Sequence, residues 1–282
     1  MKLQRIDLYK HFHLEKKAEY KGILYLYISD KSYIENPKPL LYPAMFIIPG
    51  GGYSMVSNRE AEAVALSFLS RGFISAYLDY SVNVPYPVSL MEAMLAMKYL
   101  RIHSRSLNIR KDRIAAVGFS AGGHLLGLLS TTTLKEKEMV KGNNLRPDAS
   151  IYSYSVITTD KRYENTWSID AIFNGSALLN RDDLSIEKRV DKKTPIAFIW
   201  HCEGDTVVDK HNSLLLKEAL DKYKIDNELF ITKGEVHGYS TCTMLINMPK
   251  YMNKDIKEAS IWVDKSVDFL LAHDFKTILK DN

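Results

Sequence analysis

A serine stands between two glycines near the middle of the chain, in the run Gly118-Phe119-Ser120-Ala121-Gly122. Apolar residues precede and follow this run, which predicts a strand before the serine and a helix after it. The turn from such a strand into such a helix is so sharp that side chains two positions before and after the serine would collide. Glycine at both positions avoids the collision. The hydroxyl of Ser120 would then project above the sheet, beside the positive N-terminal end of the helix. This arrangement is typical of a nucleophilic serine.

A run of three glycines, 50–52, follows an apolar segment at residues 44–48 that we predict to be a buried strand. Because no side chains intervene, the amides of such a loop can turn toward a ligand and stabilise an oxyanion, each by typically ~3 kcal/mol in the transition state. We predict that amides of this loop provide such donors together with the amide of Ala121. A phosphate-binding loop is the alternative, but the sequence lacks the motifs of P-loops and dinucleotide folds.

A serine hydroxyl needs a base, and the base needs an acid that orients it. Among the eight histidines, His237 lies in a glycine-flanked loop just after the last predicted strand, where it can reach back over the sheet edge. We predict that it is the base. Asp205 follows a glycine in the turn after the predicted strand 195–201 and is predicted to be the acid. Glu203 is the alternative acid, and Asp209 is predicted to cap the next helix.

Other titratable residues near these motifs are given structural roles. His124 lies one turn into the helix after the serine, where we expect it to cap or pack. The adjacent residues His201, Cys202 and Glu203 would point to opposite faces of an extended chain, so we predict no metal site there.

The elements that must position these residues alternate along the chain. Strands are predicted at residues 22–29, 44–48, 72–80, 113–118, 149–153, 195–201 and 228–232, and helices at 59–70, 88–102, 121–129, 212–224 and 256–272. This order predicts a mostly parallel, twisted sheet of about eight strands with helices on both faces. We expect one domain over residues 1–282, with a small lid at 154–194.

Composition excludes several other classes of protein. The chain has 282 residues, of which 46% are apolar and 26% charged, as in ordinary globular proteins. Its net charge of +4 is too small and too evenly spread to predict a nucleic-acid partner. Two cysteines cannot make a disulfide framework, and no apolar run reaches the ~20 residues that span a bilayer. We expect a soluble, cytoplasmic protein without a membrane partner; whether it forms a homo-oligomer is left open.

Taken together, the motifs resemble the α/β-hydrolase superfamily. The motifs are Gly-Phe-Ser-Ala-Gly-Gly-His at 118–124, Pro-Gly-Gly-Gly-Tyr at 49–53, Gly-x-x-His-Gly at 234–238 and Pro-Tyr-Pro at 85–87. More narrowly, they are similar to its bacterial esterase/lipase branch, which includes acetyl-xylan-esterase-like and feruloyl-esterase-like enzymes. The resemblance spans roughly residues 40–275. Many relatives carry a histidine where this chain has Pro49, a difference that leaves the amide donors in place.

The resemblance implies a serine carboxylester hydrolase without a cofactor, often acting on acylated sugars through an acyl-enzyme. The residues that it assigns to the site are Ser120 as nucleophile, Asp205 as acid and His237 as base, with the amides of Gly51 or Gly52 and of Ala121 as the oxyanion hole. A small-amide hydrolase with the same three side chains is one alternative. A non-catalytic binding protein on a hydrolase scaffold is the other.

Three aromatic residues are candidates for substrate contact. Tyr53, Tyr163 and Trp167 could offer a stacking face to a sugar ring, although aromatic side chains are more often simply buried.

Overall fold

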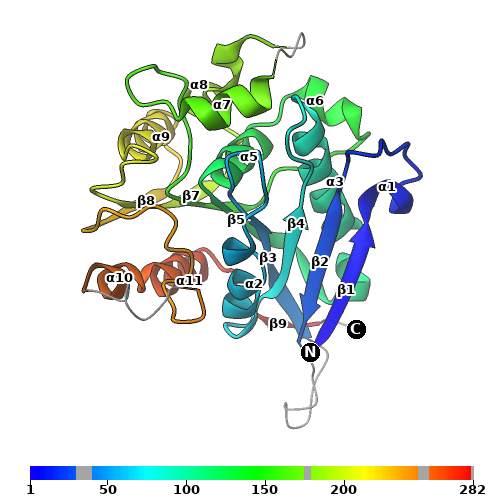
Figure 1. The fold of residues 1–282 in the computed structure, drawn as a ribbon. Helices are drawn as coiled ribbons and strands as arrows, with labels where there is room; N and C mark the ends of the chain where they lie inside the picture. The colour runs from blue at the N-terminus through cyan, green and yellow to red at the C-terminus, as the bar shows by residue number, and fades with distance from the viewer. Residues whose placement is uncertain (30–39, 175–178, 247–253, 281–282) are drawn as a thin grey trace.

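A nine-stranded sheet forms the centre of the computed structural model, which describes residues 1–29, 40–174, 179–246 and 254–280 (Figure 1). Its strands are β1 (Lys2–Asp7), β2 (Ile23–Ile28), β3 (Leu40–Ile48), β4 (Ile74–Asp79), β5 (Ile109–Phe119), β6 (Ala149–Ser153), β7 (Ile196–Cys202), β8 (Asn227–Thr232) and β9 (Ile278–Leu279). The order across the sheet is β1-β2-β4-β3-β5-β6-β7-β8, and β9 pairs with β3.

Six neighbouring strands, from β4 to β8, run parallel to one another. Strand β2 pairs antiparallel with both β1 and β4, and β9 pairs antiparallel with β3. The expectation of a mostly parallel sheet of about eight strands is therefore confirmed. Because parallel strands carry their carboxyl ends to one edge, the loops after β3, β5, β7 and β8 can meet there.

Helices cover both faces of the sheet (Figure 1). One face carries α1 (Leu8–His11), α3 (Val88–Ile102), α4 (Ser104–Leu107), α5 (Ala121–Ser130), α7 (Thr166–Phe173), α8 (Ile186–Arg189) and α9 (His211–Lys222). The other face carries α2 (Glu62–Leu69), α10 (Lys254–Ala259) and α11 (Trp262–Ala272). The short α6 (Leu134–Met139) follows α5. Each face has its own hydrophobic core, so the central strands are buried on both sides.

Two predicted helices are interrupted in the structure. In place of a helix over 59–70, a 3₁₀ turn η2 (Asn58–Glu60) precedes α2, and Glu60 turns its carboxylate inward. In place of a helix over 256–272, α10 and α11 meet at a break before Trp262. The break lets the Trp262 indole enter the core, where it stacks on Trp200 with ring centroids 5.1 Å apart. Strand β1 was not predicted, because most of its residues are polar. In the structure its side chains are exposed or partly exposed.

The segment 154–194 packs onto the main core. It contains α7, η3 (Arg181–Leu184) and α8, and its residues 175–178 lie outside the described part. Ile169, Ile172 and Ile186 belong to the same hydrophobic core as α3 and α5. Of the predicted lid, α7 is the part that borders the pocket described below.

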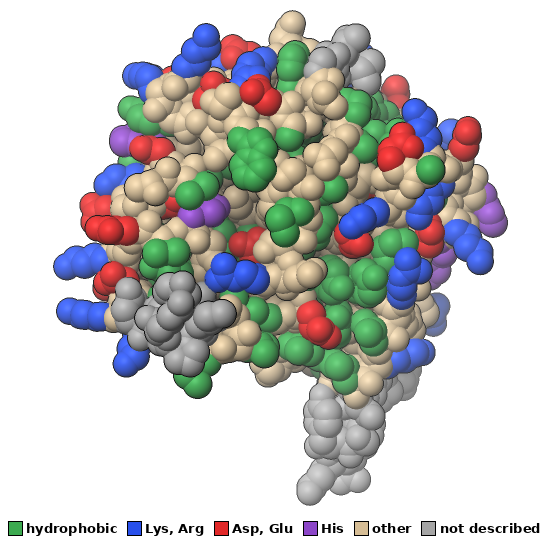
Figure 2. Space-filling view, in the orientation of Figure 1, with side chains coloured by type: hydrophobic (Ala, Val, Ile, Leu, Met, Phe, Trp, Pro, Cys, Tyr) green, Lys and Arg blue, Asp and Glu red, His purple; other side chains and the backbone are tan. Residues whose placement is uncertain are grey.

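The surface facing the viewer in Figure 2 carries acidic and basic side chains interspersed around its outline, with hydrophobic side chains nearer the middle. Within the described ranges, no helix has both the length and the apolar composition that crossing a membrane requires. Cys202 and Cys242 are both buried and unlinked.

Candidate active site

Ser120 occupies the turn between β5 and α5. Its backbone is strained, with φ at +51°, in the left-handed region that non-glycine residues rarely adopt. A Cβ on Gly118 would lie 2.5 Å from the Gly122 carbonyl oxygen, and a Cβ on Gly122 would lie 2.2 Å from the carbonyl oxygens of Ile48 and Pro49. These contacts explain why both positions are glycine and why the turn abuts the end of β3.

Three side chains from three loops form a chain of hydrogen bonds. The His237 Nε2 lies 2.9 Å from the Ser120 Oγ, and its Nδ1 lies 2.6 Å from the Asp205 Oδ2. Because a carboxylate can only accept, Nδ1 carries the proton and Nε2 accepts from the serine hydroxyl. The structure thus brings together the three residues that the sequence singled out, from positions 120, 205 and 237. In this tautomer the imidazole can take the serine proton.

The loop after β7 fixes the carboxylate of Asp205. Its Oδ1 accepts hydrogen bonds from the amides of Val207 and Val208 at 2.9 and 3.0 Å. Burial raises the pKa of Asp205, but the hydrogen bond and charge of His237 and the backbone donors outweigh it, so the pKa lies below its ordinary value. The alternative acid, Glu203, is exposed and pairs with Lys210 instead.

The glycine loop after β3 is held against the Ser120 turn. The Gly50 amide donates to the Glu60 Oε2 at 2.8 Å, and the Tyr80 hydroxyl donates to the Pro49 carbonyl at 2.8 Å. A Cβ on Gly50 would lie 3.0 Å from the Ser120 Cβ, so the glycine loop and the Ser120 turn are in contact.

The amides predicted to bind an oxyanion lie at this junction. Gly51 and Gly52 adopt φ of +121° and +64°, which bends the loop back on itself. Among the described residues, neither amide donates a hydrogen bond, whereas the Gly51 carbonyl accepts from the amides of Ser54 and Met55. Ala121 is the first residue of α5, where a backbone amide has no partner within the helix.

A pocket of about 270 Å³ opens above these groups. It is lined by the glycine loop, the turn of Ser120 and the loop of His237, together with α7 and its flanks; the side chains include Met55, Arg59, Glu60, Asn165, Trp167 and Val207. Trp167 is 65% exposed. Its ring lies beside Gly52, since a Cβ added to that glycine would be 3.4 Å from the ring. Of the three aromatic candidates, Trp167 is the one that lines this pocket.

The structure contradicts a stacking role for Tyr53. Its side chain is 1% exposed, and its hydroxyl donates to the His124 Nδ1 at 2.8 Å in the interior. Tyr163 also lies outside the pocket lining, because its ring stacks on His211 with centroids 4.2 Å apart. His124 packs internally as expected, and its Nε2 donates to the Leu184 carbonyl at 2.7 Å.

Glu60 is a pocket residue that sequence reasoning missed. It is 5% exposed and lies next to the glycine loop and the Ser120 turn. Its Oε2 accepts from the Gly50 amide and its Oε1 accepts from the Tyr154 hydroxyl, both at 2.8 Å. The one hint in the sequence is a carboxylate at the start of a largely apolar helix pattern, directly after the glycine loop.

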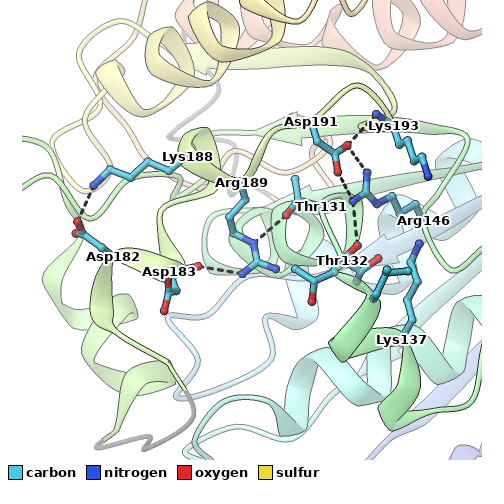
Figure 3. Close-up of a pocket in the computed structure, with 12 residues that line it drawn as sticks. Thr131, Thr132, Lys137, Arg146, Asp182, Asp183, Lys188, Arg189, Asp191 and Lys193 are labelled. Carbon is cyan, nitrogen blue, oxygen red and sulfur yellow. Dashed lines mark hydrogen bonds and ion pairs between the residues drawn. The ribbon is translucent and has the colours of Figure 1, made fainter.

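A second, larger pocket of about 460 Å³ lies at the far end of α5 (Figure 3). Helix α5 has 10 residues, which separates its two ends by about 15 Å. Ion pairs hold several of the charged groups there, as Figure 3 shows for Arg146 with Asp191 and for Lys188 with Asp182. The described residues that line it include no serine, cysteine or histidine, so it holds no second set of side chains like that of Ser120 and His237.

Known proteins are similar to this chain in sequence and in fold. A family model described as BD-FAE matches residues 33–220. Endo-1,4-beta-xylanase B of Butyrivibrio fibrisolvens is 34% identical over 69% of the chain, and an acetylxylan esterase of Xylanibacter ruminicola is 34% identical over 48% of it. The matches cover 32% and 26% of those two proteins, so the chain spans about a third or less of their length.

Among solved structures, an acetyl ester-xyloside bifunctional hydrolase from Caldicellulosiruptor lactoaceticus superposes with a TM-score of 0.76 and 30% identity. That match covers 94% of this chain and 97% of the other. Solved α/β hydrolases share the same sheet and helix arrangement. The chain belongs to the BD-FAE family and has the α/β-hydrolase fold.

Proposed function

We propose that the protein is a serine carboxylesterase that removes small acyl groups from acylated sugars or oligosaccharides. The observation that carries the proposal is the continuous hydrogen-bond chain from the Ser120 hydroxyl through His237 to Asp205. Membership of the BD-FAE family supports it. So do the acetylxylan esterase and the acetyl ester-xyloside hydrolase among the similar proteins.

In the proposed reaction, the Ser120 Oγ attacks the ester carbonyl carbon while the His237 Nε2 takes the hydroxyl proton. The amides of Gly51 or Gly52 and of Ala121 hold the oxyanion that forms. His237 then returns the proton to the departing alcohol, leaving an acyl-enzyme. Water, deprotonated by the same histidine, attacks the acyl group, and the acid leaves as Ser120 is regenerated.

The size and lining of the pocket favour a substrate with a small acyl group and a cyclic alcohol. Its volume of about 270 Å³ fits a short acyl chain with one sugar unit better than a long lipid. The exposed ring of Trp167 stands beside Gly52, where it can stack on a sugar ring of the leaving alcohol.

The test compares the wild type with Ser120→Ala. We expect the wild type to hydrolyse 4-nitrophenyl acetate and acetylated xylo-oligosaccharides, and to be labelled by a fluorophosphonate. Ser120→Ala should lose the labelling and at least about a thousandfold in kcat. Equal rates in the two proteins would remove the mechanism. A preference for acylamides over esters would instead identify a small-amide hydrolase.

A further inference from the structure

The buried carboxylate of Glu60 joins three loops that meet at the candidate active site. From the glycine loop it accepts the amide of Gly50, and from the end of β6 it accepts the hydroxyl of Tyr154. The Tyr154 hydroxyl oxygen in turn accepts the amide of Ser240, at 3.0 Å, from the loop that carries His237. The hydrogen bonds around Glu60 therefore link the oxyanion side of the site to the base side.

The directions of these hydrogen bonds suit a carboxylate. The Gly50 amide can only donate. Because the Tyr154 oxygen already accepts from Ser240, its own proton is free to go to Glu60. Glu60 must accept at both oxygens, as an unprotonated carboxylate does. A glutamine side chain could accept at its oxygen only. Its NH2 group would then face either the Gly50 amide or the Tyr154 hydroxyl, both of which donate.

The backbone around this network is strained. Tyr154 adopts φ of +39° and Ser240 adopts φ of +52°, both in the left-handed region. Such conformations persist where the surroundings hold them. The Ser240 Oγ donates to the Arg59 carbonyl at 2.6 Å, and the Trp262 indole donates to the Ser240 carbonyl at 2.8 Å. These bonds tie the loop after β8 to η2 and to the core.

The same tyrosine contacts the proposed base directly. The Tyr154 ring packs edge-on against the His237 imidazole, with centroids 4.9 Å apart and an interplanar angle of 70°. A shift of Tyr154 would therefore move the imidazole relative to the Ser120 hydroxyl. Displacements of about 1 Å at such groups can cost 10²-fold in rate.

We propose that Glu60 is a positioning residue: its carboxylate holds the glycine loop and Tyr154 so that the oxyanion amides and His237 face the same point above Ser120. This inference rests on the proposed esterase function. Glu60 does not exchange protons with the substrate; it acts through Gly50 and Tyr154. Its contribution should therefore be felt in the transition state more than in substrate binding.

The test uses Glu60→Gln, Tyr154→Phe and the double variant with 4-nitrophenyl acetate. We expect Glu60→Gln to lower kcat by about 10- to 100-fold with KM within about twofold, as for loss of transition-state stabilisation. Tyr154→Phe should lower kcat by about three- to tenfold. Because both act in one network, the double variant should lose less than the product of the two single losses.

A second readout separates positioning from general loosening of the fold. A boronic acid forms a tetrahedral adduct with an active serine and mimics the transition state, whereas acetate, the product, does not. We expect Glu60→Gln to weaken boronic acid inhibition by the same factor as kcat/KM and to leave acetate inhibition unchanged.

Glu62 provides a matched control two residues along the chain. It accepts a hydrogen bond from the Tyr27 hydroxyl at 3.2 Å and does not line the pocket. Glu62→Gln therefore removes the same charge beside another tyrosine. We expect its kcat, KM and boronic acid inhibition to match those of the wild type.

The outcomes distinguish this inference from the proposed function. A wild-type kcat in Glu60→Gln, or a loss confined to KM, overturns the positioning role. If Glu60→Gln does not fold, Tyr154→Phe decides by the same criterion. If Ser120→Ala is as active as the wild type, the esterase mechanism itself fails. If Ser120→Ala is inactive while Glu60→Gln and Tyr154→Phe keep the wild-type kcat, the inference about Glu60 fails alone.

Discussion

The Tyr53 hydroxyl and the His124 imidazole form a hydrogen bond of 2.8 Å in the interior of the protein. Tyr53 is 1% exposed and His124 is fully buried. His124 Nε2 donates to the Leu184 carbonyl, so in the neutral ring Nδ1 accepts from the tyrosine hydroxyl. Burial lowers the pKa of His124 to about 4.

This buried pair predicts an acid-dependent loss of stability. Between pH ~6.5 and ~4 the unfolded chain protonates this histidine and the folded chain does not, so the free energy of unfolding falls as the pH falls. The contribution of this one group is at most about 3 kcal/mol. We expect His124→Gln to lose that part of the slope when urea unfolding is measured at several pH values. Parallel stability curves for the two proteins would contradict the prediction.

Asp205→Asn tests the orientation of the imidazole. Because one side-chain oxygen must still accept from the amides of Val207 and Val208, asparagine would turn its NH2 group toward the His237 Nδ1. Nδ1 would then accept, Nε2 would carry the proton, and the ring could not take the serine proton. We expect kcat to fall by about 10³- to 10⁴-fold with little change in KM. Glu203→Gln, in the exposed alternative acid, should keep the wild-type kcat. Similar activity losses in the two variants would refute the assignment of Asp205.

Gly122→Ala tests the close contact between the Ser120 turn and the end of β3. The new Cβ would lie 2.2 Å from two backbone carbonyl oxygens, which cannot move without shifting β3. We expect a loss of about 3 kcal/mol or more in the free energy of unfolding. Gly72→Ala is the control: φ there is +88°, but no atom lies within 4 Å. It should cost about 1 to 2 kcal/mol through backbone strain alone. An equal loss of stability in both variants would show that the close contacts at Gly122 cost nothing beyond backbone strain.

Trp167→Ala tests the proposed stacking of Trp167 on a sugar ring. We expect KM for acetylated xylo-oligosaccharides to rise about three- to tenfold, the range of one aromatic stacking contact. KM for ethyl acetate, whose alcohol has no ring, should stay within about twofold. Leu134→Ala, another exposed apolar residue, which lines the far pocket, is the control and should change neither value. Equal effects of Trp167→Ala on both substrates would argue against stacking.

The sequence predicted the parts of the site that depend on short-range patterns. The glycines around Ser120 are required by contacts within the turn and with the strand beside it, and the glycine run was recognised for a similar reason. Asp205 and His237 could be placed because each follows a strand, and parallel strands end at the same edge. The alternation of strands and helices predicted the mostly parallel sheet of the α/β-hydrolase fold, which the sheet order and the solved structures confirm.

What could not be predicted depends on contacts between distant parts of the chain. Glu60 and Tyr154 are 94 positions apart, and no local pattern reveals their hydrogen bond. Tyr53 was misassigned because a tyrosine beside a glycine loop can point outward or inward, and its partner, His124, lies 71 positions away. The break before Trp262 also follows from a distant partner, the ring of Trp200.

The unequal placement of the three tryptophans gives the protein an internal optical probe. Trp200 and Trp262 are fully buried, whereas Trp167 stands 65% exposed at the mouth of the pocket. An aqueous quencher such as iodide should therefore reach the indole of Trp167 and spare the other two. A molecule seated in the pocket would shield that indole, so occupancy could be followed by fluorescence in the unlabelled Ser120→Ala protein, without turnover.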